Sequence, residues 1–233
     1  ISLMPAPSVH PTDAGIIFVA TLSPPPLFCY HWPMAKSRRD RADSYTLKAR
    51  AEGYPARSVY KLEEMQQHFS LIKGGDTVLD VGAAPGSWTL YVARKFLTKR
   101  GRIVAVDLNP LSLHPLPEGV VELVGDAFSE EIRAQLVAHG PYDVIISDAA
   151  PQTSGIRSVD TSRSEALCES VIALASEQLA VGGNLVVKLF QGGGQEALIK
   201  EMRELFTRVK PYKPKACRDD SFEVYLVGLD RRG

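Results

Sequence analysis

Two residues in the second half of the chain have side chains that can transfer a proton or stabilise a charge. Asp148 ends the apolar run 142–148, and Lys188 lies inside the apolar run 185–190. A lysine is rarely buried without a partner, so a carboxylate on the neighbouring strand is the expected one. The alternative is a lysine that extends to solvent from a strand end. A paired Lys and Asp could deprotonate a weak nucleophile or stabilise a developing anion.

A glycine-bearing turn at residues 80–88, with the sequence Asp-Val-Gly-Ala-Ala-Pro-Gly-Ser-Trp, is the second candidate for chemistry. Because an apolar run precedes it and apolar residues at helical spacing follow it, the pattern predicts a strand, a turn and a helix. In an open α/β sheet, ligands bind at such turns, at the carboxyl ends of the strands. We expect the glycines to let the backbone approach a ligand, and Ser87 to cap the following helix. The alternative is a tight turn that binds nothing.

Three acidic residues indicate which ligand the turn would bind. Asp80 lies in the turn motif, and Asp107 and Asp126 end the next two predicted strands. Asp107 is positioned to accept hydrogen bonds from ribose hydroxyls, and Asp126 from an adenine amino group. The G-x-x-x-G spacing differs from the G-x-G-x-x-G of dinucleotide sites, and nearby acids disfavour a pyrophosphate. S-adenosylmethionine has no phosphate and carries cationic groups, so the acids favour it. Trp88 is expected either to shield its methionine end or to be a core aromatic.

Composition disfavours several other classes of function. The 233 residues are 45% hydrophobic and 23% charged, which is typical of a soluble globular chain, and no apolar run approaches the length of a membrane span. The three cysteines are far apart, so we expect neither a disulfide framework nor a zinc motif, and a reducing cytoplasm. Strong P-loop, G-x-S-x-G and histidine-based metal motifs are absent, so we expect no bound metal.

The N-terminal part of the chain changes character near Met34. Residues 1–33 contain seven prolines and no Lys or Arg, which predicts an irregular or disordered extension and suggests Met34 as the true start. Residues 36–61 hold eight basic residues against three acidic ones, so we expect a phosphate-contacting arm over 34–56. The alternative is a solvated helix face. The basic residues are Lys36, Arg38, Arg39, Arg41, Lys48, Arg50, Arg57 and Lys61.

The rest of the chain alternates apolar runs with segments of helical periodicity, which predicts an α/β fold. The runs are apolar enough to be buried on both faces, so we expect a mostly parallel seven-stranded sheet with an antiparallel edge hairpin. The predicted strands are 77–81, 102–107, 120–124, 142–148, 184–190, 208–212 and 222–228. The predicted helices are 44–69 with a break at 53–55, 89 to about 100, 129–139, 161–180 and 195–207.

From residue 57 to residue 226 the chain resembles the FtsJ/RrmJ-type RNA 2'-O-methyltransferases. The resemblance rests on several segments, which are 57–62, the turn at 82–88, Ser147-Asp148-Ala149-Ala150-Pro151 with Ser154-Gly155, 187–192, and 221–226. It implies a Rossmann-like SAM-dependent methyltransferase fold over 57–233, with helices on both faces of the sheet. It also implies a Lys-Asp-Lys-Glu catalytic tetrad at Lys61, Asp148, Lys188 and Glu223. The cofactor contacts that it implies are Gly86, Trp88, Asp107, Asp126 and Asp148.

The activity that the resemblance implies is methyl transfer from S-adenosylmethionine to a ribose 2'-oxygen, expected at a uridine of large-subunit ribosomal RNA. The enzyme would act as a cytoplasmic monomer on the assembled subunit. Lys188 would serve either as a base or as a charged stabiliser of the alkoxide, and the sequence leaves both open. The alternatives are the tRNA-directed branch of the family and a non-catalytic RNA-binding or ribosome assembly factor. A small-molecule methyltransferase would leave the basic arm unexplained.

Overall fold

The computed structural model describes residues 44–218 and 221–233. The expectations for residues 1–33, for Met34 as the start and for the first ten residues of the basic arm lie outside the described residues.

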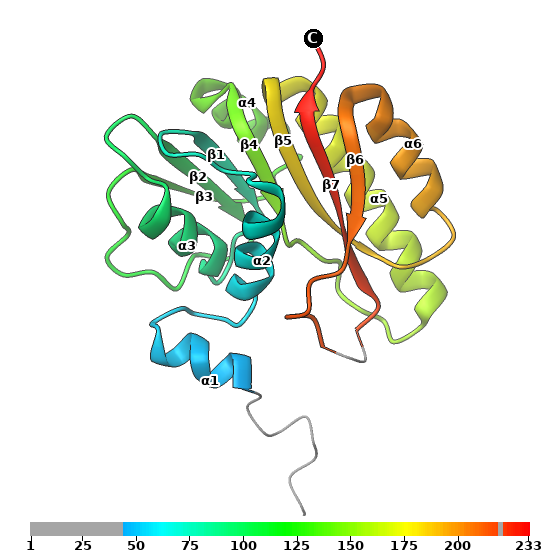
Figure 1. Ribbon diagram of the computed structural model, residues 1–233, viewed down its shortest axis with the longest axis horizontal. Coiled ribbons are helices and arrows are strands. Elements are labelled where there is room, and N and C mark those ends of the chain that lie inside the picture. Colours follow the sequence, from blue (N-terminus) through cyan, green and yellow to red (C-terminus); the bar gives the residue numbers. More distant parts are fainter. Residues whose placement is uncertain (1–43, 219–220) are drawn as a thin grey trace, which may run out of the picture. The chain divides into compact units, whose positions relative to one another are not determined.

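Over the described residues, seven strands form one sheet in the order β3-β2-β1-β4-β5-β7-β6 (Figure 1). Strands β3, β2, β1, β4 and β5 pair in parallel, in that order across the sheet. Strand β7 is antiparallel to both of its neighbours, β5 and β6. The mostly parallel sheet with an antiparallel edge hairpin is therefore confirmed. The strands are β1 (Thr77–Val81), β2 (Arg102–Asp107), β3 (Val120–Val124), β4 (Tyr142–Ser147), β5 (Leu179–Phe190), β6 (Phe206–Tyr212) and β7 (Glu223–Arg231).

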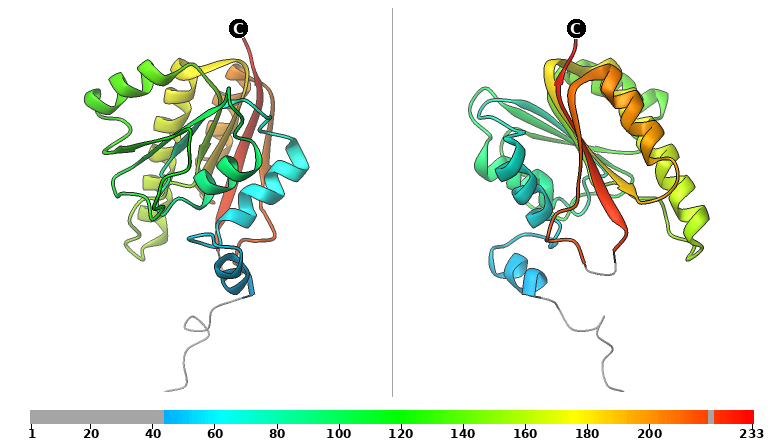
Figure 2. Two further views of the ribbon diagram at one scale, coloured as in Figure 1. Left: turned by 90° about the vertical axis from the view of Figure 1, so that its left-hand side faces the viewer. Right: turned by 45° about the vertical axis from the view of Figure 1, so that its right-hand side comes forward.

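Helices cover both faces of the sheet, as the right-hand view of Figure 2 shows. Buried residues of α2 and α3 pack on one face with alternate strand residues such as Ile103, and those of α4, α5 and α6 pack on the other with the intervening ones such as Val104. This alternation follows from the two-residue period of a strand, since both faces are buried. The helices over the described residues are α1 (Ser44–Ala51), α2 (Val59–Phe69), α3 (Ser87–Lys95), α4 (Glu130–His139), α5 (Arg157–Gln178) and α6 (Gln195–Leu205).

Element boundaries differ from the prediction where side chains or turns decide them. Helix α5 begins at Arg157 rather than at 161. The carboxylate of Asp160 accepts hydrogen bonds from the backbone N–H groups of Ser154 and Gly155, which ties the preceding loop to the first helical turn. Strand β5 begins at Leu179, earlier than the predicted start at residue 184. Helix α3 ends at Lys95, earlier than the predicted end near residue 100.

The register of the parallel strands brings the candidate residues to one edge of the sheet. Ser147, the last residue of β4, is paired with Val187 of β5, so Asp148 and Lys188 follow at the same level. On the other side of β5, Lys188 is paired with Tyr225 of β7. These pairings align one acid, one lysine and one tyrosine across three adjacent strands.

Candidate active site

The four residues of the predicted tetrad come together at the carboxyl edge of the sheet. Lys188 Nζ lies 3.0 Å from Asp148 Oδ1 and donates a second hydrogen bond to the Asp148 backbone carbonyl. On α2, Lys61 Nζ lies 2.7 Å from Glu223 Oε1 and 4.0 Å from Asp148 Oδ1. The result is a chain of alternating charge in which Asp148 contacts both lysines. The predicted pairing of Lys188 with Asp148 is therefore present, and Lys188 does not simply extend to solvent.

Helix α2 positions Lys61 through its amphipathic pattern. Val59, Leu62 and Met65 are buried against the sheet, which places the intervening Lys61 at the border between the core and the site. The side chain of Lys61 retains only 12% of its exposure, and that of Lys188 retains 9%. Charges this deeply buried need partners, because desolvation penalises the ionised form. The ion pairs within the site supply them.

The charged neighbours determine the ionisation of this site. Burial disfavours the charged form of Lys61, but the carboxylates of Asp148 and Glu223 outweigh it and raise the pKa of Lys61. Burial also opposes ionisation of Asp148, yet Lys188 and Lys61, with a hydrogen bond from Tyr225, lower the pKa of Asp148. Asp148 is therefore an anion and Lys61 a cation at neutral pH.

Sequence reasoning missed Tyr225 as a member of the site. Its hydroxyl donates a 2.6 Å hydrogen bond to Asp148 Oδ1, the same oxygen that Lys188 contacts. The ring is fully buried, with its centroid 5.9 Å from that of Trp88 and 5.8 Å from Lys61 Nζ. A tyrosine within an apolar strand looks like a core residue. The available signal was its position two residues after Glu223, on the same face of β7.

A cleft of about 650 Å³ opens beside the tetrad. It is within the range of volumes of small-molecule sites, and Asp107, Asp126 and Asp148 all line it. Asp107 Oδ2 accepts a hydrogen bond from the N–H of Ala84 and Oδ1 one from that of Asn109. These contacts orient the carboxylate and leave lone pairs for further donors. The cleft therefore suits a ligand with hydroxyl donors, and its acids suit a positive charge.

The glycine-bearing turn forms one wall of this cleft. Gly82 has φ +76°, and a Cβ there would lie 2.5 Å from the Cβ of Ala149. A side chain at this position would therefore push the β1 and β4 loops apart. Gly86, also predicted to contact the cofactor, has φ +107° and faces Leu113 instead of the cleft. Its role is the backbone turn that begins α3.

Ser87 takes a different role from the one expected of it, whereas Trp88 takes one of its two expected roles. Gly86, not Ser87, is the N-cap of α3, and Ser87 Oγ instead accepts a hydrogen bond from the N–H of Ala56. The capping expectation was wrong because the side chain is used to hold the segment before α2. Trp88 is a core aromatic, 2% exposed, whose Nε1 donates to the carbonyl of Ser58. One side of it borders a small cavity that Asp148 also lines.

Asp80 is not at the rim, although the sequence grouped it with the cleft acids. It is 1% exposed and accepts a 2.7 Å hydrogen bond from the Thr89 hydroxyl. Burial raises the pKa of Asp80 to about 7, and the nearby acids Asp148 and Asp107 add to this. Asp80 therefore connects the start of α3 to β1 and borders only the small cavity under the turn.

Comparison with models of protein families shows which family this chain belongs to. The model of the FtsJ-like methyltransferase family matches residues 54–231. This chain belongs to the FtsJ-like methyltransferases. The match spans α2, the whole sheet and every residue of the tetrad, so the predicted family and fold are confirmed.

Individual relatives of this FtsJ-like methyltransferase agree with the assignment. It is 50% identical over 200 residues to the ribosomal RNA large subunit methyltransferase E of Treponema denticola, covering 86% of this chain and all of that protein. The protein of the same name from Oleidesulfovibrio alaskensis is 46% identical, covering 82% and 92%. A Plasmodium falciparum structure described as a ribosomal RNA methyltransferase has a TM-score of 0.67 at 26% identity and covers 77% of this chain and all of that one. Aeropyrum pernix fibrillarin, solved with S-adenosylmethionine, shares the fold with a TM-score of 0.57 at 19% identity, covering 74% and 76%.

Proposed function

We propose that this FtsJ-like methyltransferase transfers a methyl group from S-adenosylmethionine to the 2'-oxygen of a ribose in large-subunit ribosomal RNA. The observation that carries the proposal is the Lys61–Asp148–Lys188–Glu223 constellation, which borders a cleft lined with carboxylates. The relatives from Treponema denticola and Oleidesulfovibrio alaskensis are both named ribosomal RNA large subunit methyltransferase E, and they match this chain over most of its length. Within that class, the proposed target is a uridine, as the resemblance in sequence implies.

S-adenosylmethionine is the cofactor, and the residues of the cleft fit it. Its methyl group is bound to a positively charged sulfur, which makes the carbon electrophilic. Asp107 is oriented by backbone N–H groups and keeps lone pairs for ribose hydroxyls. Asp126 is held through Oδ1 by the N–H of Phe128, and its Oδ2 accepts no hydrogen bond from the described residues. That oxygen remains for an amino group. The contacts of Gly86 and Trp88 are proposed to be indirect, through the turn that they hold.

The tetrad residues are proposed to position and polarise the 2'-hydroxyl. An ammonium has three N–H donors, and Lys188 uses two of them on Asp148, which leaves one for the substrate oxygen. Lys61 stays charged beside Glu223 and adds a second cation to stabilise a developing alkoxide. Asp148 and Glu223 hold the two amines in place. This geometry favours Lys188 as a donor that stabilises negative charge over Lys188 as the base. The methyl–sulfur bond then breaks as the methyl–oxygen bond forms, the sulfonium becomes a neutral thioether, and the hydroxyl proton passes to water in the open cleft.

The described end of the basic arm supports RNA as the substrate. On α1, Lys48 and Arg50 are both exposed. The Lys48 amine contacts Glu52 at 3.8 Å and lies 4.3 Å from the centroid of the Tyr60 ring. Exposed pairs of this kind cost little to break, so both residues are available to phosphates.

Over the described residues, none of the helices is long and apolar enough to span a membrane. The described part also contains no group of three side chains suited to hold a metal. We propose a cytoplasmic enzyme that acts on the assembled subunit.

The substrate can be tested with methyl-tritiated cofactor and purified RNA. The enzyme is given three substrates in parallel, which are large ribosomal subunits from cells that lack this gene, protein-free ribosomal RNA, and bulk tRNA. We expect label on the subunits, and mass spectrometry of the nucleosides should identify 2'-O-methyluridine. Label on tRNA alone would assign the enzyme to the tRNA-directed branch and overturn the proposed target. An absence of label on every RNA would instead support a binding or assembly factor.

A further inference from the structure

Three side chains at the rim of the active site belong to neither hydrophobic core. The rings of Phe190 and Phe222 lie 4.8 Å apart between centroids and are tilted by 58°. The guanidinium carbon of Arg157 lies 5.3 Å from the centroid of Phe222. Both phenylalanines are partly exposed, Arg157 is exposed, and neither ring is part of or packed against the two buried clusters. Their packing thus contributes little to the core. The arrangement also leaves apolar surface in contact with water.

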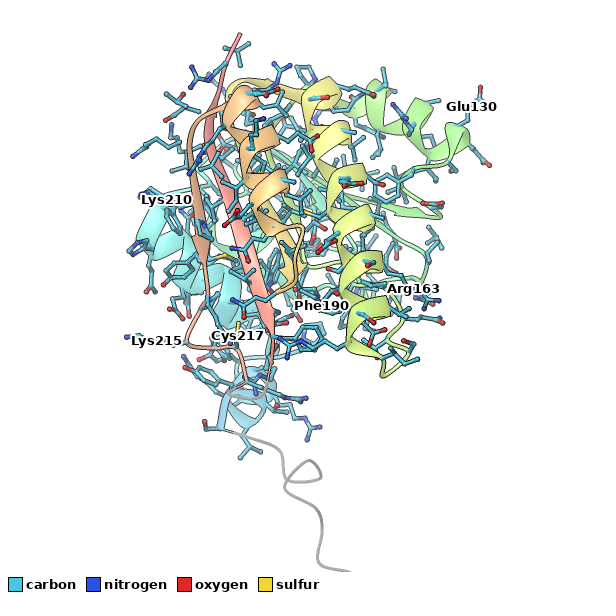
Figure 3. All side chains as sticks on the ribbon, turned by 90° about the vertical axis from the view of Figure 1, so that its right-hand side faces the viewer. Glu130, Arg163, Phe190, Lys210, Lys215 and Cys217 are labelled. Carbon is cyan, nitrogen blue, oxygen red and sulfur yellow. The ribbon has the colours of Figure 1, made fainter. Side chains whose placement is uncertain are left out.

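This aromatic group is continuous with the tetrad. Phe190 follows Lys188 by two residues, so the two lie on the same face of β5 about 7 Å apart along the strand. Phe222 directly precedes Glu223, which is paired with Phe190 across the sheet. Figure 3 shows Phe190 beside the first turns of α5, at the same end of the sheet as Cys217. The Phe190 N–H also donates to Ser164 of α5.

The chemistry of the group suits an unstacked nucleobase. Proteins bind splayed-out RNA bases by stacking them on aromatic rings or on arginine guanidinium planes. Arg157 contacts the Phe222 ring, and its N–H groups have no hydrogen-bond acceptor among the described residues, so they remain available to a base edge or to a phosphate. A purely apolar partner would not need this cation. The cation, the aromatic rings and the short distance to Lys188 all favour a nucleotide that neighbours the reacting ribose.

We propose that Arg157 and Phe222, supported by Phe190, form a stacking site for an unstacked base next to the methylated ribose. The proposal rests on the proposed function, because it takes RNA as the substrate. The base inserts at the rim while its neighbour presents the 2'-hydroxyl to Lys188. Binding there fixes the register of the strand and so contributes to the choice of target.

The first test separates stacking from packing and from charge. Phe222→Leu keeps apolar volume but removes the aromatic face, and Phe222→Tyr keeps that face. Arg157→Lys keeps the charge but removes the plane. For unmodified large subunits, we expect Phe222→Leu to raise KM about tenfold and Arg157→Lys to raise it severalfold, with little change in kcat. Phe222→Tyr should stay within about twofold of the native enzyme, since the ring is retained.

Controls exclude indirect effects. Arg163→Lys is the matched control, because Arg163 is exposed on the same helix and contacts the Gln152 carbonyl rather than the rings (Figure 3). It should leave KM unchanged. The affinity for S-adenosylhomocysteine, measured by calorimetry, should be the same in all variants. Thermal unfolding checks the fold, and if Phe222→Leu does not fold, Arg157→Lys at its exposed position provides the test. An unchanged KM in Arg157→Lys and Phe222→Leu overturns the proposal.

A second readout does not depend on methyl transfer. A short single-stranded RNA that contains 2-aminopurine loses fluorescence when this base stacks on an aromatic side chain. The native enzyme should quench it, and Phe222→Leu should lose most of the quenching. If the native enzyme methylates no RNA but this difference persists, the proposed function fails and the stacking site stands. If methylation is normal and Phe222→Leu quenches as the native enzyme does, the stacking site is refuted and the proposed function stands.

Discussion

Removing one hydroxyl group, in Tyr225→Phe, should weaken both the stability and the acid tolerance of the site. The hydroxyl donates to Asp148 Oδ1 at 2.6 Å, whereas the fully buried ring packs beside Trp88. Phenylalanine fills nearly the same volume, so the packing is retained and the hydrogen bond alone is lost. The substitution therefore measures what Tyr225 contributes to Asp148.

The magnitude follows from the type of hydrogen bond and from the exposure of its acceptor. A hydrogen bond to an ionised group contributes about 1.5–3 kcal/mol. Because the Asp148 side chain retains 20% of its exposure, water replaces part of it, and we expect a loss of about 1–2 kcal/mol in the free energy of unfolding. Losing this hydrogen bond should also raise the pKa of Asp148, because the bond favours the ionised carboxylate.

The direction of the pH effect follows from the lowered pKa of Asp148. Ionised Asp148 stabilises the fold above its ordinary pKa, and this contribution disappears as the pH falls through the pKa of the folded state. Since Tyr225→Phe raises that folded pKa, the variant should lose stability at a higher pH than the native enzyme. The acid limb of kcat/KM should move to higher pH as well, if Asp148 must be ionised for turnover.

The assay is urea unfolding across the acid range, together with the pH profile of methyl transfer. Tyr212→Phe is the matched control, because its hydroxyl donates to Glu64 at 2.8 Å, outside the tetrad. The control should lose some stability without moving the acid limb. Native stability and a native pH profile in Tyr225→Phe would refute the assignment of Tyr225 to the site.

Four further substitutions test the turn, the buried acid and the second ion pair. Gly82→Ala should abolish binding of S-adenosylhomocysteine in calorimetry, because the added Cβ meets backbone atoms, whereas Gly86→Ala meets only a leucine side chain and should retain more binding. Because the folded pKa of Asp80 is raised to about 7, native stability should fall as the pH rises from about 4 toward 7, and Asp80→Asn should flatten this slope in urea unfolding. Glu223→Gln weakens the 2.7 Å pair with Lys61 and should lower kcat about 10- to 100-fold with unchanged cofactor affinity. A native kcat in Glu223→Gln would remove it from the tetrad.

Local sequence patterns predicted the elements that position the site. The bounds of β1, β2 and β3 match the predicted ones, because each strand is a short apolar run that ends at a turn. The proximity of Asp148 and Lys188 was also predictable, since residues that end neighbouring parallel strands lie at the same edge.

Contacts between distant segments were not predictable in the same way. The hydroxyl of Tyr225 points to Asp148 only because β7 inserts antiparallel beside β5, and a tyrosine among valines and leucines carries no sign of that. Ser87 accepts from Ala56 rather than capping α3, because the segment before α2 folds back onto the turn. The early start of α5 likewise depends on the Asp160 carboxylate and the two N–H groups that it binds.

The most direct test of the central claim is the single-turnover rate of Lys188→Met on large ribosomal subunits, with cofactor bound beforehand. Methionine matches the apolar stem of lysine but lacks the amine that contacts Asp148. If Lys188 polarises the 2'-hydroxyl, the rate should fall about 100- to 10,000-fold while S-adenosylhomocysteine still binds. A variant that binds the cofactor and keeps most of its single-turnover rate would contradict the proposed role of the tetrad.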